Sequence, residues 1–256
     1  MPRLLPPQKL KPGVPVRLTL AGLDEEVRGS HLDEMASWPN VELGFHFRAT
    51  PERLKQAHHR RWLAEVLPMV QAKHARAALH LVNAAGVEDF LQGRLDDLAV
   101  HVARIKIGSA VSSEALCSVC DRFPDKQIIT AYKGQNQSLL QEIDRENHAV
   151  LFDETGLGFS RRRWFRPETD KAIGFIAKLA PDQVALRLDQ FGGLLDARSW
   201  IELKEAVFTA TRFDFGRARD LVGAFEQYTE ALNVRSETRS QQAQSRAQAC
   251  ATAQVA

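Results

Sequence analysis

The feature that most restricts the fold is a series of short apolar runs, rich in β-branched residues, that alternate with helical or loop segments. Such alternation is typical of parallel strands joined by helical crossovers. Eight runs qualify, which is the number that closes a barrel: Val16–Ala21, Val41–Phe47, Ala77–Val82, Ala103–Ile107, Gln127–Ala131, Ala149–Asp153, Ile173–Ala177 and Trp200–Leu203. We therefore predict an α/β protein with a single (β/α)8 TIM barrel over residues 16–235. A doubly wound open sheet is the alternative.

Helices are predicted between these runs, with Thr50 and Ser112 as N-caps because a Glu follows each of them two residues later, in the first helical turn. The predicted helices cover residues 52–73, 85–98, 112–122, 136–146, 181–195 and 214–233. Residues 154–171 are basic and aromatic, and no helix is predicted there.

Both ends of the chain differ from the predicted barrel. Residues 1–15 hold five of the eleven prolines and are predicted to form an N-terminal arm. Residues 236–256 are polar, with few large apolar groups to offset the entropy of ordering them. We expect a disordered or frayed helical tail there.

Charge, cysteine content and hydropathy indicate which partners and which location to expect. The 34 basic and 32 acidic residues leave a net charge of +2, which makes nucleic acid an unlikely partner. Three cysteines are too few for a disulfide framework and favour a cytoplasmic location. No stretch approaches the roughly 18 apolar residues of a membrane helix. We expect a small-molecule ligand and no cofactor or metal.

Catalytic groups of such barrels come from the carboxyl ends of the strands and the loops that follow. The ionisable residues at these positions are Asp24, His46, Arg48, His80, Lys106, Lys133, Asp153, Glu154, Lys178, Lys204 and Glu205. Asp153 ends a strongly apolar run, a setting that can raise a carboxyl pKa for acid chemistry. The alternative is a structural role, in which the Asp153 carboxylate accepts hydrogen bonds from loop amides.

Other polar clusters have structural explanations. Cys117 and Cys120 form an isolated C-x-x-C inside a predicted helix, so we expect packing residues and no zinc site. His58 and His59 are adjacent and are expected on a solvated, basic helix face. Lys106 and Lys178 could form an imine or hold a phosphate, but ion pairing with Asp153 or Glu205 is the favoured interpretation.

The run Arg161–Arg166 combines cations with aromatic rings. It could grip a phosphate, a base or an acidic protein partner, with Arg163 as a substrate-binding candidate. The alternative is a basic loop that stays solvated.

Four segments resemble phosphoribosylanthranilate isomerase. Leu18–Leu23 resembles its first strand, and Leu151–Gly158 is similar to the family's Leu-Leu-Asp-Ser with its following glycines. Trp164 lies where the family also has a Trp. Gly174–Val184 resembles the phosphate-binding segment, and Trp200–Val207 resembles the last strand. The resemblance spans about residues 16–232 at low identity.

The resemblance implies an Amadori rearrangement, in which an acid opens a ribosylamine ring and a base removes the proton from C2. The acid corresponds to Asp153. The family's basic Cys corresponds to Ala21, which cannot accept a proton. Lys178 replaces a phosphate-loop glycine, and Glu205 and Ala206 replace Ser-Gly. Lys106 and Gly108 replace a Gln and a His on the fourth strand.

Two functions follow as hypotheses. The first is a diverged isomerase-like enzyme acting on a small, phosphorylated or sugar-derived metabolite. Its catalytic candidates are Asp153, Asp24 and Glu205, with His46 as a further candidate base, and its binding candidates are His46, Arg48, His80, Lys106, Lys178 and Arg163. The second is an inactive barrel that serves as a ligand-binding or protein-interaction module, through the loop Arg161–Arg166. An imine-forming lyase that uses Lys106 or Lys178 is a third, weaker hypothesis.

Overall fold

Eight parallel strands close into a barrel in sequence order in the computed structural model, which describes residues 11, 16–50, 52–132, 138–152 and 169–253. The barrel strands are β1 (Arg17–Leu23), β2 (Val41–Phe47), β3 (Arg76–Leu81), β4 (Arg104–Ile107), β5 (Gln127–Tyr132), β6 (His148–Phe152), β7 (Ala172–Ile176) and β8 (Trp200–Leu203). The predicted single (β/α)8 barrel is confirmed, and the open-sheet alternative is wrong, because β1 pairs with both β2 and β8.

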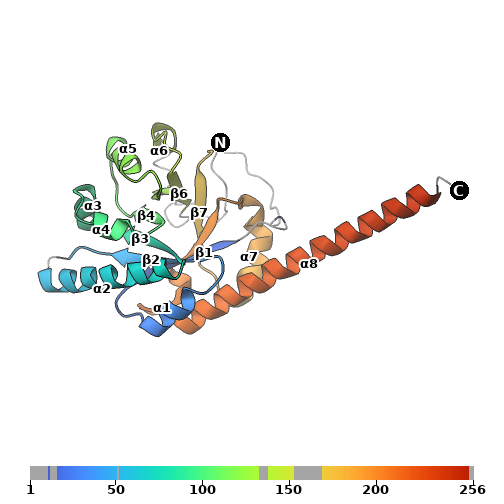
Figure 1. Ribbon diagram of the computed structural model, residues 1–256, viewed down its shortest axis with the longest axis horizontal. Helices are drawn as coiled ribbons and strands as arrows, with labels where there is room; N and C mark the ends of the chain where they lie inside the picture. The colour runs from blue at the N-terminus through green and yellow to red at the C-terminus, as the bar shows by residue number, and fades with distance from the viewer. Residues whose placement is uncertain (1–10, 12–15, 51, 133–137, 153–168, 254–256) are drawn as a thin grey trace, which may run out of the picture.

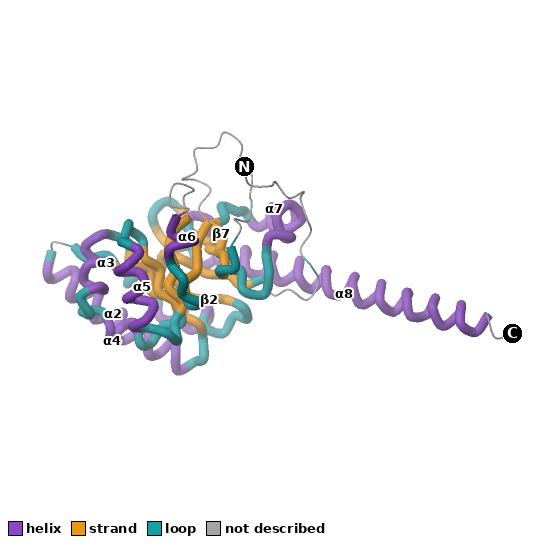
Figure 2. Tube along the Cα trace, turned by 90° about the horizontal axis from the view of Figure 1, so that it is seen from above, coloured by secondary structure: helices purple, strands orange, loops and turns teal. Residues whose placement is uncertain are grey.

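Helices surround the barrel, as the two perpendicular views show (Figures 1 and 2). They are α1 (Gly29–Met35), α2 (Arg53–Ala72), α3 (Ala84–Leu91), α4 (Asp96–Ala99), α5 (Ser113–Arg122), α6 (Ser138–Glu142), α7 (Val184–Phe191) and α8 (Phe215–Ala253), with the 3-10 turns η2 (Pro181–Gln183), η3 (Gly192–Leu194) and η4 (Glu205–Val207). A short hairpin of β9 (Phe208–Thr209) and β10 (Arg212–Phe213) precedes α8. Among the described helices, none combines the length and apolarity needed to cross a membrane.

Helix boundaries follow local signals in some places and not in others. Ser112 caps α5 by accepting a hydrogen bond from the Ala115 amide at 3.2 Å, as predicted. Thr50 is not an N-cap, because α2 begins after Glu52 and the Thr50 hydroxyl donates to the Glu52 carbonyl instead. The predicted helix 85–98 is two helices, since Gly93 adopts a φ of 79° between α3 and α4.

The last helix is longer than predicted. The helix expected to end at residue 233 continues to Ala253 and extends well beyond the barrel (Figure 1). Its first turns pack on the barrel through the buried Leu221 and Phe225, and the Tyr228 hydroxyl donates to Asp189 of α7 at 2.7 Å. The segment from residue 236 to 253 is therefore helical in the structure.

Side chains alternate between two environments along each strand. Outward-facing apolar residues such as Leu20, Phe45 and Phe175 are fully buried under the helices and form the main core. The barrel interior holds a smaller apolar cluster: Ile129, Ala149, Leu151, Ala172 and Trp200, with Ile176 packed against it. Other described interior positions carry small residues, such as Ala21 and Gly44, or polar and charged side chains, such as Glu42, Arg104 and Glu202.

Gly174 makes room for the buried indole of Trp200. A Cβ at position 174 would lie 2.1 Å from Trp200 Cε2, and Trp200 is only 1% exposed, so the ring has nowhere to move. We predict that Gly174→Ala lowers the free energy of unfolding by roughly 1–3 kcal/mol through overpacking. Urea denaturation measures this.

Gly223→Ala is the matched control. Gly223 lies inside α8, and no neighbouring atom lies within 4 Å of the point that an added methyl group would occupy. The substitution should therefore stabilise the protein by roughly 0.5–1 kcal/mol. Equal effects of the two substitutions would contradict this packing of Trp200.

Candidate active site

The described strand-end candidates all lie at the carboxyl end of the barrel. Asp24 follows β1, Arg48 follows β2, Lys178 follows β7, and Lys204 and Glu205 follow β8. His46, His80 and Lys106 lie near the carboxyl ends of β2, β3 and β4 and are paired in register across these neighbouring strands. Four other candidates lie outside the described residues, namely Lys133, Asp153, Glu154 and Arg163, together with the rest of the loop Arg161–Arg166.

Lys106 forms an ion pair across the barrel interior. Its Nζ lies 2.5 Å from Glu202 Oε1, and the two residues come from β4 and β8, on opposite sides of the barrel. Glu202 is only 1% exposed. Sequence reasoning missed this partner, although a Glu between Ile201 and Leu203 in a strand is a signal for an interior acid.

His46 and His80 lie side by side next to this pair. Their ring centroids are 5.7 Å apart, and Gly44 leaves the space that His80 fills, since a Cβ there would lie 2.9 Å from His80 Cε1. The Nδ1 atom of His80 is buried and has no hydrogen-bond partner within the described part of the chain. An unpaired buried polar atom is costly, and it is a feature expected of sites that bind water or a ligand.

Both imidazoles are neutral at pH 7. Burial, followed by the positive charges of Lys204, Lys106 and Arg48, lowers the pKa of His46 to about 3. Burial and Lys106 lower the pKa of His80 well below its usual value. A neutral imidazole can accept a proton, so the pair supplies base capacity beside fixed cations.

His59 contacts the backbone of His46. Its Nε2 lies 2.7 Å from the His46 carbonyl oxygen, and its Nδ1 pairs with Glu25. The expectation that His58 and His59 share a solvated face is therefore wrong for His59, which lies on the side of α2 that faces the barrel, while His58 is exposed. Sequence reasoning missed this contact because it joins residues on different elements.

Asp24 caps its own loop. Its Oδ1 accepts a hydrogen bond from the Glu26 amide at 3.1 Å, and burial raises the pKa of this carboxyl. Gly22, two residues earlier, has a φ of 104° and lies under the ring of Phe208. A Cβ added at Gly22 would lie 2.6 Å from that ring. The same Cβ position lies 3.5 Å from His46 Cε1, so Phe208 covers the end of β1 next to His46.

Cations outnumber their partners at this end. Lys178 pairs with Glu205, as predicted from the sequence. Both side chains are about half exposed. Arg48 and Lys204 are exposed and form no ion pair with any described residue. The site can therefore attract an anion and offers neutral imidazoles beside it. The described residues contain no cluster of three potential metal ligands.

The two helical cysteines lie away from this site, on α5. Cys120 is buried and Cys117 half-buried, and neither forms a disulfide. Burial raises the pKa of the Cys120 thiol to about 11, which suits a packing residue.

Comparisons with known proteins identify the fold. No protein-family model and no curated protein matches this chain. It is similar to the solved structure of phospho-2-dehydro-3-deoxyheptonate aldolase (DAHP synthase) from Thermotoga maritima, with a TM-score of 0.55, 11% identity, and coverage of 88% of this chain and 70% of that chain. A truncated form of 3-deoxy-D-arabino-heptulosonate 7-phosphate synthase from the same organism has a TM-score of 0.53 at 14% identity, covering 87% and 90%.

Octameric ribulose-1,5-bisphosphate carboxylase/oxygenase from Pyrococcus horikoshii gives a TM-score of 0.55 at 13% identity, covering 89% of this chain and 63% of that chain. At such identities, the similarity shows the barrel fold alone.

The buried His148 and the half-buried His46 are neutral, which makes stability depend on pH. Burial lowers the pKa of His148 to about 4, and that of His46 to about 3, from an ordinary value near 6.5. The unfolded chain binds more protons below pH 6.5, so their contribution is complete above 6.5 and is lost as the pH falls to about 4 for His148 and about 3 for His46. We predict that His46→Gln reduces the slope of unfolding free energy against pH between 4.5 and 6 by up to about 1.4 kcal/mol per unit.

Urea denaturation at several pH values measures this slope. The exposed His58→Gln is the matched control and should keep the wild-type slope. A wild-type slope in His46→Gln as well would show that His46 is not buried in its neutral form.

Proposed function

We propose that this protein is a diverged isomerase-like barrel that acts on a small, phosphorylated or sugar-derived metabolite by acid–base chemistry at the carboxyl end of its strands. The observation that carries the proposal is the neutral pair His46 and His80 beside Lys106, Lys204 and Arg48. Lys204 and Arg48 have no ion-pair partner among the described residues. Proton acceptors next to such cations suit a reaction in which an anionic substrate loses a proton from carbon.

His46 is the best candidate base among the described residues. Glu205 is engaged by Lys178 and Asp24 by the Glu26 amide, whereas the imidazole of His46 is neutral and its ring lies at the strand end. A bound anion would oppose the charges of Lys204, Lys106 and Arg48 that lower the pKa of His46. Binding would thus raise that pKa above its value in the free protein and make the imidazole a stronger base when substrate is present.

Asp153 remains the proposed acid. It directly follows Phe152, the last residue of β6, and the resemblance to phosphoribosylanthranilate isomerase assigns it that role. Lys178 is at the position of a phosphate-loop glycine, where the family binds phosphate through backbone amides. Once released from its ion pair with Glu205, Lys178 would attract a phosphate through its charge.

Ala21 supports the second candidate function, a barrel that binds a ligand without turnover. Its side chain is fully buried in the structure and cannot replace the family's basic Cys. The neighbouring interior position on β2 is Gly44, so neither residue of this strand pair supplies an acid or a base, and the His80 ring is the group that fills the space beside Gly44.

The test is turnover of phosphoribosylanthranilate in D2O, followed by proton NMR of the product and of solvent exchange at C2. We predict a rate that is absent or at least about 10²-fold below ordinary enzyme rates of roughly 1–10³ per second, because the usual base is missing. Any residual exchange should be lost in His46→Gln and Asp153→Asn and kept in His58→Gln.

Two outcomes decide between the candidate functions. Ala21→Cys combined with Lys178→Gly should raise the rate if the chain keeps the family's chemistry. Binding of the substrate with no exchange in either protein would reject the enzyme and support the binding module, and ordinary wild-type rates that survive His46→Gln would reject His46 as the base.

A further inference from the structure

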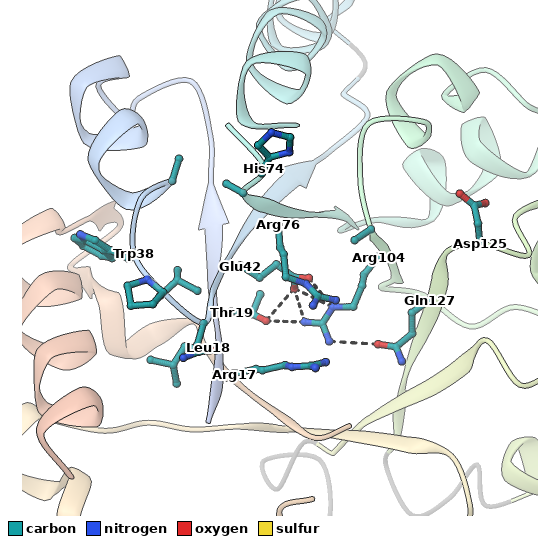
Figure 3. Close-up of a pocket in the computed structure, with 16 residues that line it drawn as sticks. Arg17, Leu18, Thr19, Trp38, Glu42, His74, Arg76, Arg104, Asp125 and Gln127 are labelled. Carbon is teal, nitrogen blue, oxygen red and sulfur yellow. Dashed lines mark hydrogen bonds and ion pairs between the residues drawn. The ribbon is translucent and has the colours of Figure 1, made fainter. Parts of the chain in front are cut away.

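A cavity of about 480 Å³ opens at the opposite, amino-terminal end of the barrel. The first residues of β1 to β5 line it, together with Trp38 and His74 at its edge (Figure 3). Its size is in the range of small-molecule sites. The candidate active site does not share any of its lining residues.

Arg104 forms the floor of this cavity and is fully engaged. Its Nε donates to Glu42 Oε2 at 2.7 Å, one terminal nitrogen donates to Thr19 Oγ1 at 2.7 Å, and its guanidinium stacks 4.2 Å from the centre of the Trp200 ring. Glu42 therefore neutralises Arg104, and the pair is 4% and 7% exposed. This buried pair holds the floor rigid.

Arg17 and Arg76 are left without a counter-charge. Both side chains reach into the same cavity as Arg104 (Figure 3), and neither forms an ion pair or hydrogen bond with another described residue. Burial, then repulsion from Arg76 and Arg104, lowers the pKa of Arg17, and the charge of Glu42 only partly opposes this effect. Arg17 is half-buried and Arg76 is exposed, so two guanidinium groups without an ion-pair partner among the described residues lie in one cavity with a third.

The acids near the cavity do not supply the missing charge. Asp125 lies apart from the arginines in Figure 3 and pairs with Lys126 at 3.2 Å. The sequence before β1, residues 1–15, contains Arg3, Lys9 and Lys11 and no acidic residue. Among the described residues that line the cavity, only Glu42 and Asp125 are acidic, and both have a cationic partner already, so a small anion from solution can supply further negative charge.

We propose that this cavity is a second ligand site, which binds the phosphoryl group of a small polyanionic metabolite through Arg17 and Arg76. Guanidinium forks match phosphate oxygens in shape and charge, and the apolar edge at Trp38 can contact the rest of the molecule. The site lies at the end of the barrel that does not carry the proposed chemistry, and it stands whether or not that chemistry is correct.

Calorimetric titration with sodium pyrophosphate, at constant ionic strength, tests the site. We expect Arg17→Gln combined with Arg76→Gln to weaken binding by about tenfold or more, since charge-assisted hydrogen bonds are lost. Neither side chain has an ion-pair or hydrogen-bond partner in the described part of the chain, so the variant should fold. Arg61→Gln is the control for loss of an exposed positive charge, because Arg61 is an exposed residue of α2 paired with Glu65.

Lys204→Gln, at the opposite end, separates the two sites and should leave the wild-type affinity of the amino-terminal cavity unchanged. Arginine modification by phenylglyoxal gives a second readout, in which pyrophosphate should protect Arg17 and Arg76 in peptide mass spectra. Absence of pyrophosphate binding to the wild type, equal weakening by Arg61→Gln, or absence of protection would each overturn the proposal.

Discussion

The packing of the barrel interior depends on two buried charge pairs. Lys106–Glu202 and Arg104–Glu42 occupy interior positions where such barrels usually place branched apolar residues. Each isolated charge would cost several kcal/mol to bury, so the partners must stay together. The apolar filling is correspondingly reduced to a cluster around Trp200, whose indole occupies the space that Gly174 leaves free.

These pairs also explain why both ends of the barrel are positive. Each carboxylate is used by one buried cation, so Lys204 and Arg48 at one end, and Arg17 and Arg76 at the other, remain uncompensated among the described residues. At the carboxyl end burial, and after it this excess of positive charge, lowers the pKa of His46 and keeps it neutral. The same field that would attract an anion weakens the imidazole as a base, and anion binding would partly reverse that effect.

Local patterns predicted the strands well, because apolar runs bounded by breakers define them directly. The bounds of Val41–Phe47 and Trp200–Leu203 are those of β2 and β8. The interior pairs were missed, since Glu42, Arg104 and Glu202 meet their partners only when distant strands close the barrel. His59 was misassigned for the same reason: only the packing of α2 brings it to His46. The excess length of α8 has no apolar pattern behind it, so composition suggested an earlier end.

The dependence of the fold on its interior charges is the central claim, and a double-mutant cycle on Lys106→Met and Glu202→Met tests it most directly. Each single substitution leaves a buried charge unpaired, so we predict losses of roughly 3–5 kcal/mol in the free energy of unfolding. The double variant should be destabilised by at least about 2 kcal/mol less than the sum of the two. Single effects that add within about 0.5 kcal/mol would contradict the account, because they would show that the two side chains do not depend on each other.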